Sequence, residues 1–198
     1  MKLAIYGCSH TGSGPIKWNE TWPYHLYKST KIDISNFAIG ASSTQFQYDL
    51  FKNNINNFDK FIFQFTSPYR LTKYINPIQQ TKVKKYSFFP NHSNDKPMEF
   101  RTSINLESST PGKYNKEYKR WIANDNGEIL EEYKKICTVV NNHENCLYAF
   151  HWIENYTNVQ GIDIMQNNFP DIILNPGIHL DSEENQIIAM YIKERCKL

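Results

Sequence analysis

The sequence predicts a three-layer α/β fold built on a doubly wound, flavodoxin-like parallel sheet of about five strands. Three observations support this prediction. Short apolar runs of strand length alternate along the chain with amphipathic segments of helical length. The strand, helix, strand order is typical of a parallel sheet with right-handed crossovers. Small or hydroxyl-bearing residues follow several of the runs, as expected where strands end in loops.

The first elements are one apolar strand, one helix and one alternating strand. Residues 2–7 form an apolar run that stops at Gly7, which suits a central buried strand turning sharply into a loop. Trp22 and Pro23 mark a helix start, because the missing N–H of an early helical proline does no harm. Residues 31–38 then alternate apolar and polar side chains and predict the second strand.

The next helix and strand follow a loop of small residues. Ser42 or Ser43 can cap a helix over residues 44–54, and residues 59–66 predict the third strand. This strand runs into Ser67, so that three successive strand ends carry small or hydroxyl residues.

The periodic pattern stops between about residues 71 and 127, with one helical piece expected near 113–123. A connection this long within one domain is usually a lid or a binding segment. From Arg70 to Arg120 the chain has 11 Lys/Arg and 4 Asp/Glu, a balance of 11 − 4 = +7, so the rest carries 2 − 7 = −5. The excess charge indicates either a solvated insertion or an anion-binding one.

Regular elements resume after the insertion. Residues 128–141 have the apolar spacing of an amphipathic helix, and residues 145–152 predict a fourth strand. Residues 171–174 predict a short fifth strand, and Asp181 with Glu184 resembles a capping box at the start of a terminal helix.

Length and composition favour a single domain that spans residues 1–198. A chain of 198 residues, of which 40% are hydrophobic, can bury one sizeable core. No apolar stretch reaches the roughly 18 residues of a membrane span, and the N-terminal run is too short for a signal peptide, so we expect a cytoplasmic protein without membrane contact. Four cysteines without a C-x-x-C pair indicate neither a zinc site nor a disulfide framework. A net charge of +2 argues against general nucleic-acid binding.

Two residues far apart in the sequence are candidates for shared chemistry. Ser9 follows the first strand and His179 follows the last, and ligands of open α/β sheets bind beyond the carboxyl ends of the strands. A serine needs a neighbouring base to become a nucleophile. We expect His179 to be that base, and the adjacent Cys8 to be a small residue buried in the turn.

These segments resemble the SGNH (GDSL-like) hydrolase family. The match spans nearly the whole chain outside the insertion, and its first block, from Gly7 to Thr11, implies that Ser9 is the nucleophile. The second block implies an oxyanion donor at Gly40 or Ala41, and the last block implies that His179 is the base.

The sequence departs from the family pattern at two positions. Pro176 stands where the family usually has the Asp that orients the histidine, so a backbone carbonyl, Asn175 or Asp181 would have to serve instead. The family also usually has an Asn after the third strand, and this chain has none there. The hydroxyls of Thr66 and Ser67 are candidate oxyanion donors there.

Three further residues are candidates for substrate binding: Arg70, which could hold an anionic group, and His151 and Trp152 at the end of the fourth strand. The resemblance implies a serine esterase that forms an acyl-enzyme with a small ester, such as a carbohydrate O-acetyl group, and needs no metal or organic cofactor. The alternative is a catalytically weak or inactive binding protein on the same fold. A third reading has the basic insertion bind a polyanion, and the oligomeric state stays open.

Overall fold

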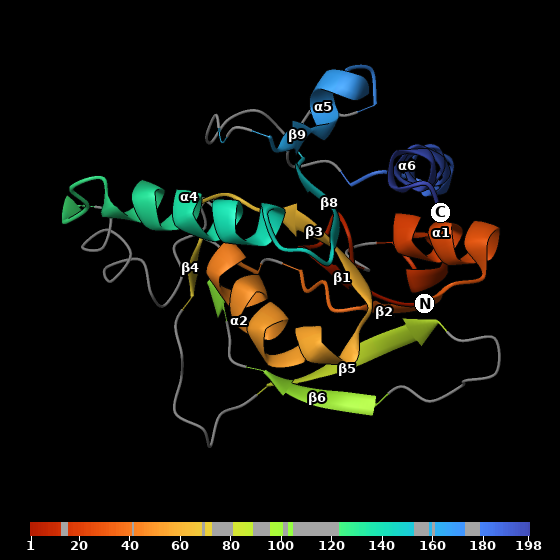
Figure 1. Ribbon diagram of the computed structural model, residues 1–198, viewed down its shortest axis with the longest axis horizontal. Coiled ribbons are helices and arrows are strands. Elements are labelled where there is room, and N and C mark those ends of the chain that lie inside the picture. Colours follow the sequence, from red (N-terminus) through yellow and green to blue (C-terminus); the bar gives the residue numbers. More distant parts are fainter. Residues whose placement is uncertain are drawn as a thin grey trace.

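Five parallel strands form the centre of one sheet in the computed structural model (Figure 1). The structure describes residues 1–12, 16–40, 42–68, 70–72, 81–88, 96–100, 103–104, 123–152, 159, 161–172 and 179–198, with only the backbone described between 71 and 104. The parallel strands are β1 (Lys2–Tyr6), β2 (Asp33–Asn36), β3 (Lys60–Phe65), β8 (Cys146–His151) and β9 (Asp163–Ile164). Their order, β2-β1-β3-β8-β9, confirms the predicted flavodoxin-like sheet.

Helices cover both faces of this sheet, which gives the three predicted layers (Figure 1). One face carries α1 (Trp22–Thr30) and α6 (Ser182–Cys196), and the other carries α2 (Thr44–Asn54) and α4 (Glu128–Asn141). The shorter helices are η1 (Trp18–Glu20), η2 (Ile55–Asn57) and α5 (Met165–Asn168).

The alternation of side chains along β1 explains why two cores form. Leu3 and Ile5 point to one face and pack in the cluster that contains residues of α1 and α6. Ala4 and Tyr6 point to the other face and pack with residues of α2 and α4. A strand buried on both sides is apolar throughout, which is why residues 2–7 read as a continuous apolar run.

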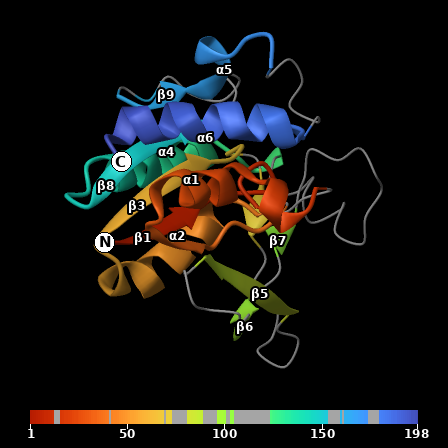
Figure 2. The ribbon, with the colours of Figure 1, turned by 90° about the vertical axis from the view of Figure 1, so that its right-hand side faces the viewer.

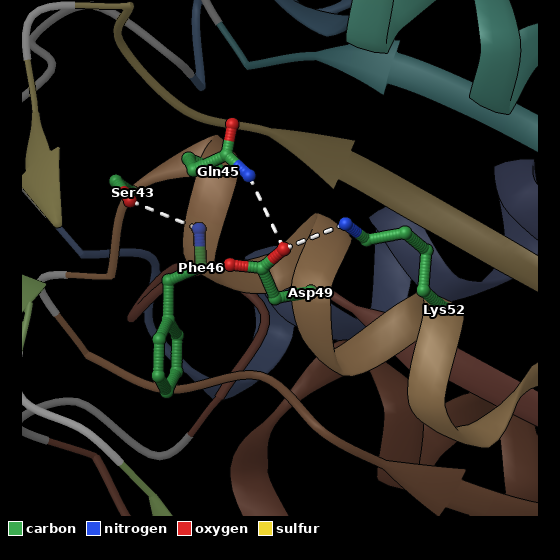
Figure 3. A network of polar contacts seen from close by, with 5 residues as sticks. All are labelled: Ser43, Gln45, Phe46, Asp49 and Lys52. Carbon is green, nitrogen blue, oxygen red and sulfur yellow. Dashed lines mark hydrogen bonds and ion pairs between the residues drawn. The ribbon is translucent and has the colours of Figure 1, made fainter. Parts of the chain in front are cut away.

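Side-chain caps fix where the two helices nearest the site begin. The Ser43 hydroxyl accepts the Phe46 N–H at 3.1 Å at the start of α2 (Figure 3). Asp181 and Glu184 form the predicted capping box of α6, each side chain accepting the other's backbone N–H. The loops that precede both helices therefore have defined ends.

The fifth parallel strand is not where the sequence placed it. It is β9, of two residues, whereas Asp171 and Ile172 lie in a turn and the remaining residues 173–174 of the predicted strand lie outside the described part. The edge position of β9, hydrogen-bonded only to β8 among the described strands, allows it to be this short.

The insertion adds strands that the sequence analysis did not predict. The strand β5 (Thr81–Phe88) pairs antiparallel with β2, and β6 (Lys96–Phe100) pairs with β5, so the sheet has seven strands within the described part of the chain. Figure 2 shows this hairpin at the end of the sheet away from β9. Two short strands, β4 (Leu71–Thr72) and β7 (Ser103–Ile104), pair with each other, and the expected helical piece at 113–123 lies almost wholly outside the described residues.

Among the described residues, no helix is long and apolar enough to cross a membrane.

Candidate active site

The turn after β1 places Ser9 at the carboxyl edge of the sheet. The N–H groups of Thr11 and Gly12 both donate to the Cys8 carbonyl, at 3.0 and 2.8 Å, which closes a tight turn around Ser9. The Cys8 side chain is only 1% exposed, whereas Ser9 is partly exposed. The thiol is therefore inside the protein and the serine is the accessible member of the pair.

Gln64 on β3 holds this turn from inside the sheet. Its Oε1 accepts the Cys8 N–H at 2.9 Å and the Thr11 hydroxyl at 3.1 Å, and its Nε2 donates to the Phe65 carbonyl. A methyl group on Gly7 would lie only 2.7 Å from Gln64 Oε1 and 2.8 Å from Thr11 Oγ1. The glycine of the first block is thus required by close packing against this buried amide.

Gln47 on α2 links the same turn to the second block. Its Oε1 accepts the Gly7 N–H at 3.2 Å, and its Nε2 donates to the Ser42 hydroxyl at 2.8 Å. The Ser42 hydroxyl in turn donates to the Gly7 carbonyl at 3.2 Å. Sequence analysis missed both glutamines, although Gln64 is conspicuous as the one polar residue in Phe-Ile-Phe-Gln-Phe.

The second block lies directly beside Ser9. Asn36 Nδ2 donates to the Thr11 carbonyl at 3.0 Å, which ties the end of β2 to the turn. A methyl group on Gly40 would lie 3.6 Å from Cβ of Ser9. Ala41, the other candidate oxyanion donor, lies outside the described residues.

His179 lies against the same turn through a stack of rings. Its imidazole stacks on the ring of His10 with 4.7 Å between centroids, and His10 stacks on Trp152 at 5.5 Å. Since His10 is the chain neighbour of Ser9, the histidine from the far end of the sequence reaches the serine turn. Nε2 of His179 is buried and has no hydrogen-bond partner in the described part of the chain.

The residue that would orient His179 stays a prediction. Pro176 and Asn175 lie outside the described residues, and Asp181 uses Oδ1 to accept the Glu184 N–H at 2.9 Å. Directly after His179, the chain is fixed by a buried asparagine, Asn185, which the sequence analysis did not single out.

Asn185 joins the start of α6 to the start of α1. Its Nδ2 donates to the carbonyls of Leu180 and Asp181, at 3.0 and 2.7 Å, and its Oδ1 accepts the Trp22 N–H at 3.0 Å. Because its side-chain amide bonds the residue next to His179, Asn185 limits where the imidazole can lie.

Arg70 adds a positive charge to this group. Its Nη1 donates to the Ser42 carbonyl at 3.3 Å, within the second block. Burial, together with the Arg70 charge, lowers the pKa of His179 below its ordinary value, so the neutral imidazole that a general base needs is favoured. Arg70 Nε is buried without a hydrogen-bond partner in the described part of the structure.

The two hydroxyl residues after β3 differ in their surroundings. The Thr66 hydroxyl lies 3.2 Å from the Thr44 hydroxyl, and Thr44 Oγ1 also accepts the Thr66 N–H at 2.9 Å. Ser67 is only 4% exposed and lines a cavity beside Arg70. An oxyanion role for either hydroxyl therefore stays a prediction.

His151 is buried beneath the site. The Tyr133 hydroxyl donates to the Thr66 carbonyl at 2.7 Å and lies 3.1 Å from His151 Nδ1, so we infer that Nδ1–H is the donor of that second bond. Burial lowers the pKa of His151 to about 4, which keeps the ring neutral. Its Nε2 has no hydrogen-bond partner among the described residues, and contact with substrate stays a prediction.

The described residues contain no group of three or more His, Cys, Asp or Glu arranged to hold a metal ion. Comparison with known protein families and with curated proteins found no match.

Proposed function

We propose that the chain is a serine ester hydrolase that forms an acyl-enzyme with a small ester, a carbohydrate O-acetyl group being one such ester. The observation that carries the proposal is the meeting of three remote segments: Gly40 lies beside Ser9, and the His179 ring stacks on the ring next to Ser9. A nucleophile, an amide donor and a base are the groups that acyl transfer requires.

In the proposed mechanism, His179 takes the proton of Ser9 as the serine oxygen attacks the acyl carbonyl. Backbone N–H groups at Ser9 and at Gly40 or Ala41 hold the oxyanion, and the alcohol leaves with a proton from His179. Water, deprotonated by His179, then releases the acid. The hydrogen bonds that Gln64 and Gln47 accept from the turn support this mechanism, because a fixed turn holds its other N–H groups ready for developing charge.

An alkyl fluorophosphonate tests the proposal, since it reacts with activated nucleophiles and leaves ordinary surface hydroxyls largely unlabelled. We expect it to label Ser9 in the wild-type protein, and both Ser9→Ala and His179→Ala to lose the label. Cys8→Ala is the matched control and keeps the label, because its thiol is buried in the turn. Labelling that survives Ser9→Ala but disappears with Cys8→Ala would mean that the cysteine is the nucleophile.

A binding protein on the same fold is the second candidate function. Two observations favour it: Pro176 replaces the usual orienting Asp, and Nε2 of His179 makes no hydrogen bond to any described residue. Loss of the acid of a triad can lower the rate about 10⁴-fold where nothing replaces it. A folded wild-type protein that takes no label would favour this candidate over the esterase.

A further inference from the structure

A cavity of about 510 Å³ lies on the face of the sheet that α2 and α4 cover, between the start of α2, the loop after β3 and α4. Apolar side chains of α4 line it, among them Ile129, Tyr133 and Ile136, together with Pro68 from the loop after β3. Its volume falls within the range of small-molecule sites, which are mostly apolar with a few polar groups. None of these four residues belongs to the nucleophile or the base proposed above.

Arg70 connects the cavity to the proposed catalytic group. Its side chain lines the cavity, its Nη1 is bonded to the Ser42 carbonyl, and its charge acts on His179. The Nε–H is buried without a partner in the described part of the structure. Because a ligand cannot reach a buried Nε, a carboxylate in the cavity would pair with the terminal Nη groups of Arg70, as in other Arg–carboxylate bonds.

Other polar groups on the cavity limit what can bind. Glu128 and Glu132, both exposed on the first turns of α4, line it together with Asp125 and give the lining negative charge. Gln45 also lines it and donates its Nε2 to Asp49 at 3.2 Å, so the amide oxygen is turned away from Asp49 (Figure 3). The negative charge of the lining repels a polyanion, whereas a single anionic group can pair with Arg70.

We propose that this cavity binds the part of the substrate remote from the scissile ester, a compact apolar group bearing one carboxylate that pairs with Arg70. The assignment of this ligand as substrate rests on the proposed esterase function. The cavity itself is a binding site whether or not Ser9 reacts.

The test compares naphthylacetate with its neutral isostere naphthylacetamide by isothermal titration calorimetry. We expect wild-type protein to bind the acid at least tenfold more tightly than the amide, because only the carboxylate pairs with Arg70. Arg70→Gln should remove this preference, Arg70→Lys should keep part of it, and Glu132→Gln should tighten binding of the acid about two- to threefold. Ile129→Trp should weaken both ligands by filling the cavity.

Two control variants lie on the same helices but do not line the cavity. Lys52 on α2 pairs with Asp49 and Glu131 on α4 pairs with Lys134, each at 2.9 Å, and Lys52→Gln and Glu131→Gln should leave both affinities unchanged (Figure 3 shows the first pair). Thermal unfolding of each variant checks that it is folded. Equal affinity for acid and amide, an unchanged preference in Arg70→Gln, or no binding of either ligand would overturn the proposal.

Kinetics separate this proposal from the esterase proposal. An aryl hemisuccinate should have a higher kcat/KM than the corresponding aryl butyrate in wild-type protein, and Arg70→Gln should abolish the difference. Equal kcat/KM values would overturn the assignment of the cavity to the substrate. If no ester is hydrolysed while naphthylacetate binds through Arg70, and Ser9→Ala binds it equally well, the esterase proposal fails and the cavity remains a carboxylate-binding site.

Discussion

At the scale of single residues, the pKa of His179, the proposed base, is set by burial and by a nearby charge. Burial disfavours the charged form of His179, and the Arg70 charge acts in the same direction. Both effects lower the pKa of His179. The neutral form of the ring therefore predominates at pH 6.5, where an ordinary histidine would be half protonated.

The lowered pKa of His179 sets the pH dependence of Ser9 labelling. The rate should fall to half its plateau only below pH 6.5, because the neutral form of His179 takes the proton and its pKa is lowered. In Arg70→Gln the decline should begin at higher pH, since one of the two causes of the lowered pKa is gone. Labelling rates with a fluorophosphonate between pH 5 and 8 measure this, and an unshifted profile in Arg70→Gln would contradict it.

His151 should affect stability through its protonation. The free energy of unfolding should fall as the pH drops from about 6.5 to about 4, because the unfolded chain takes up the proton at its ordinary pKa and the folded chain only near 4. This difference corresponds to roughly 3 kcal/mol. His151→Gln should flatten that part of the curve. Urea unfolding at pH 7 and pH 4.5 tests this, and an equal loss of stability in both proteins would contradict it.

Sequence alone located some residues of the site and missed others for a physical reason. Ser9 and Gly40 follow β1 and β2, and strand ends are visible as breaks in an apolar pattern. The sequence selects His179 through a strand predicted at 171–174, where the structure instead has Asp171 and Ile172 in a turn. The roles of Gln47 and Gln64 depend on which backbone groups of a distant segment their amides meet. No local pattern encodes such a partner, because it is set only when α2 and β3 pack against the turn.

At the scale of elements, helices were located more accurately than edge strands. Both α2 and α4 have the bounds that the sequence predicted, because apolar spacing and, for α2, a serine cap mark them locally. The strand β9 has only two residues and no apolar run, so the sequence predicts the fifth strand at 171–174 instead. Likewise, β5 forms by pairing with the edge of β2, which its own lysine-rich sequence does not indicate.

The junction between α1 and α6 should control both stability and reactivity. Asn185→Leu removes three hydrogen bonds and leaves buried backbone groups unpaired, which should destabilise the fold by about 2–4 kcal/mol. Because the loop after His179 is then released, labelling of Ser9 should also slow about tenfold at a temperature where the variant is folded.

Glu183→Gln, an exposed change on the first turn of the same helix, is the matched control and should alter neither quantity. Asn185→Asp keeps the acceptor for the Trp22 N–H but turns a second oxygen toward two carbonyls. Its stability and its labelling rate should therefore lie between those of the wild-type protein and of Asn185→Leu. A destabilised Asn185→Leu that labels at the wild-type rate would limit Asn185 to a structural role.

At the scale of the whole molecule, the charge is divided between the insertion and the rest of the chain. The stretch from Arg70 to Arg120 carries 11 − 4 = +7, and the remainder carries 2 − 7 = −5. The backbone of β5, which contains Lys82, Lys84 and Lys85, lies at the β2 edge of the sheet (Figure 2). The proposed catalytic group is built from the ends of β1, β2 and β3 and the loop before α6, with Gly40 in the loop that follows β2.

The lysines of β5 predict polyanion binding, which hydrolysis of a small neutral ester does not require. We expect weak retention on heparin that is lost as salt rises, because each lysine–anion contact releases counterions. Replacing Lys82, Lys84 and Lys85 together with Gln should lower the salt concentration at which the protein elutes. It should leave kcat/KM for a small neutral aryl ester unchanged, since a substrate without net charge gains little from the lysine charges. A triple variant that loses hydrolysis while remaining folded would instead place β5 at the substrate site, as the predicted lid requires.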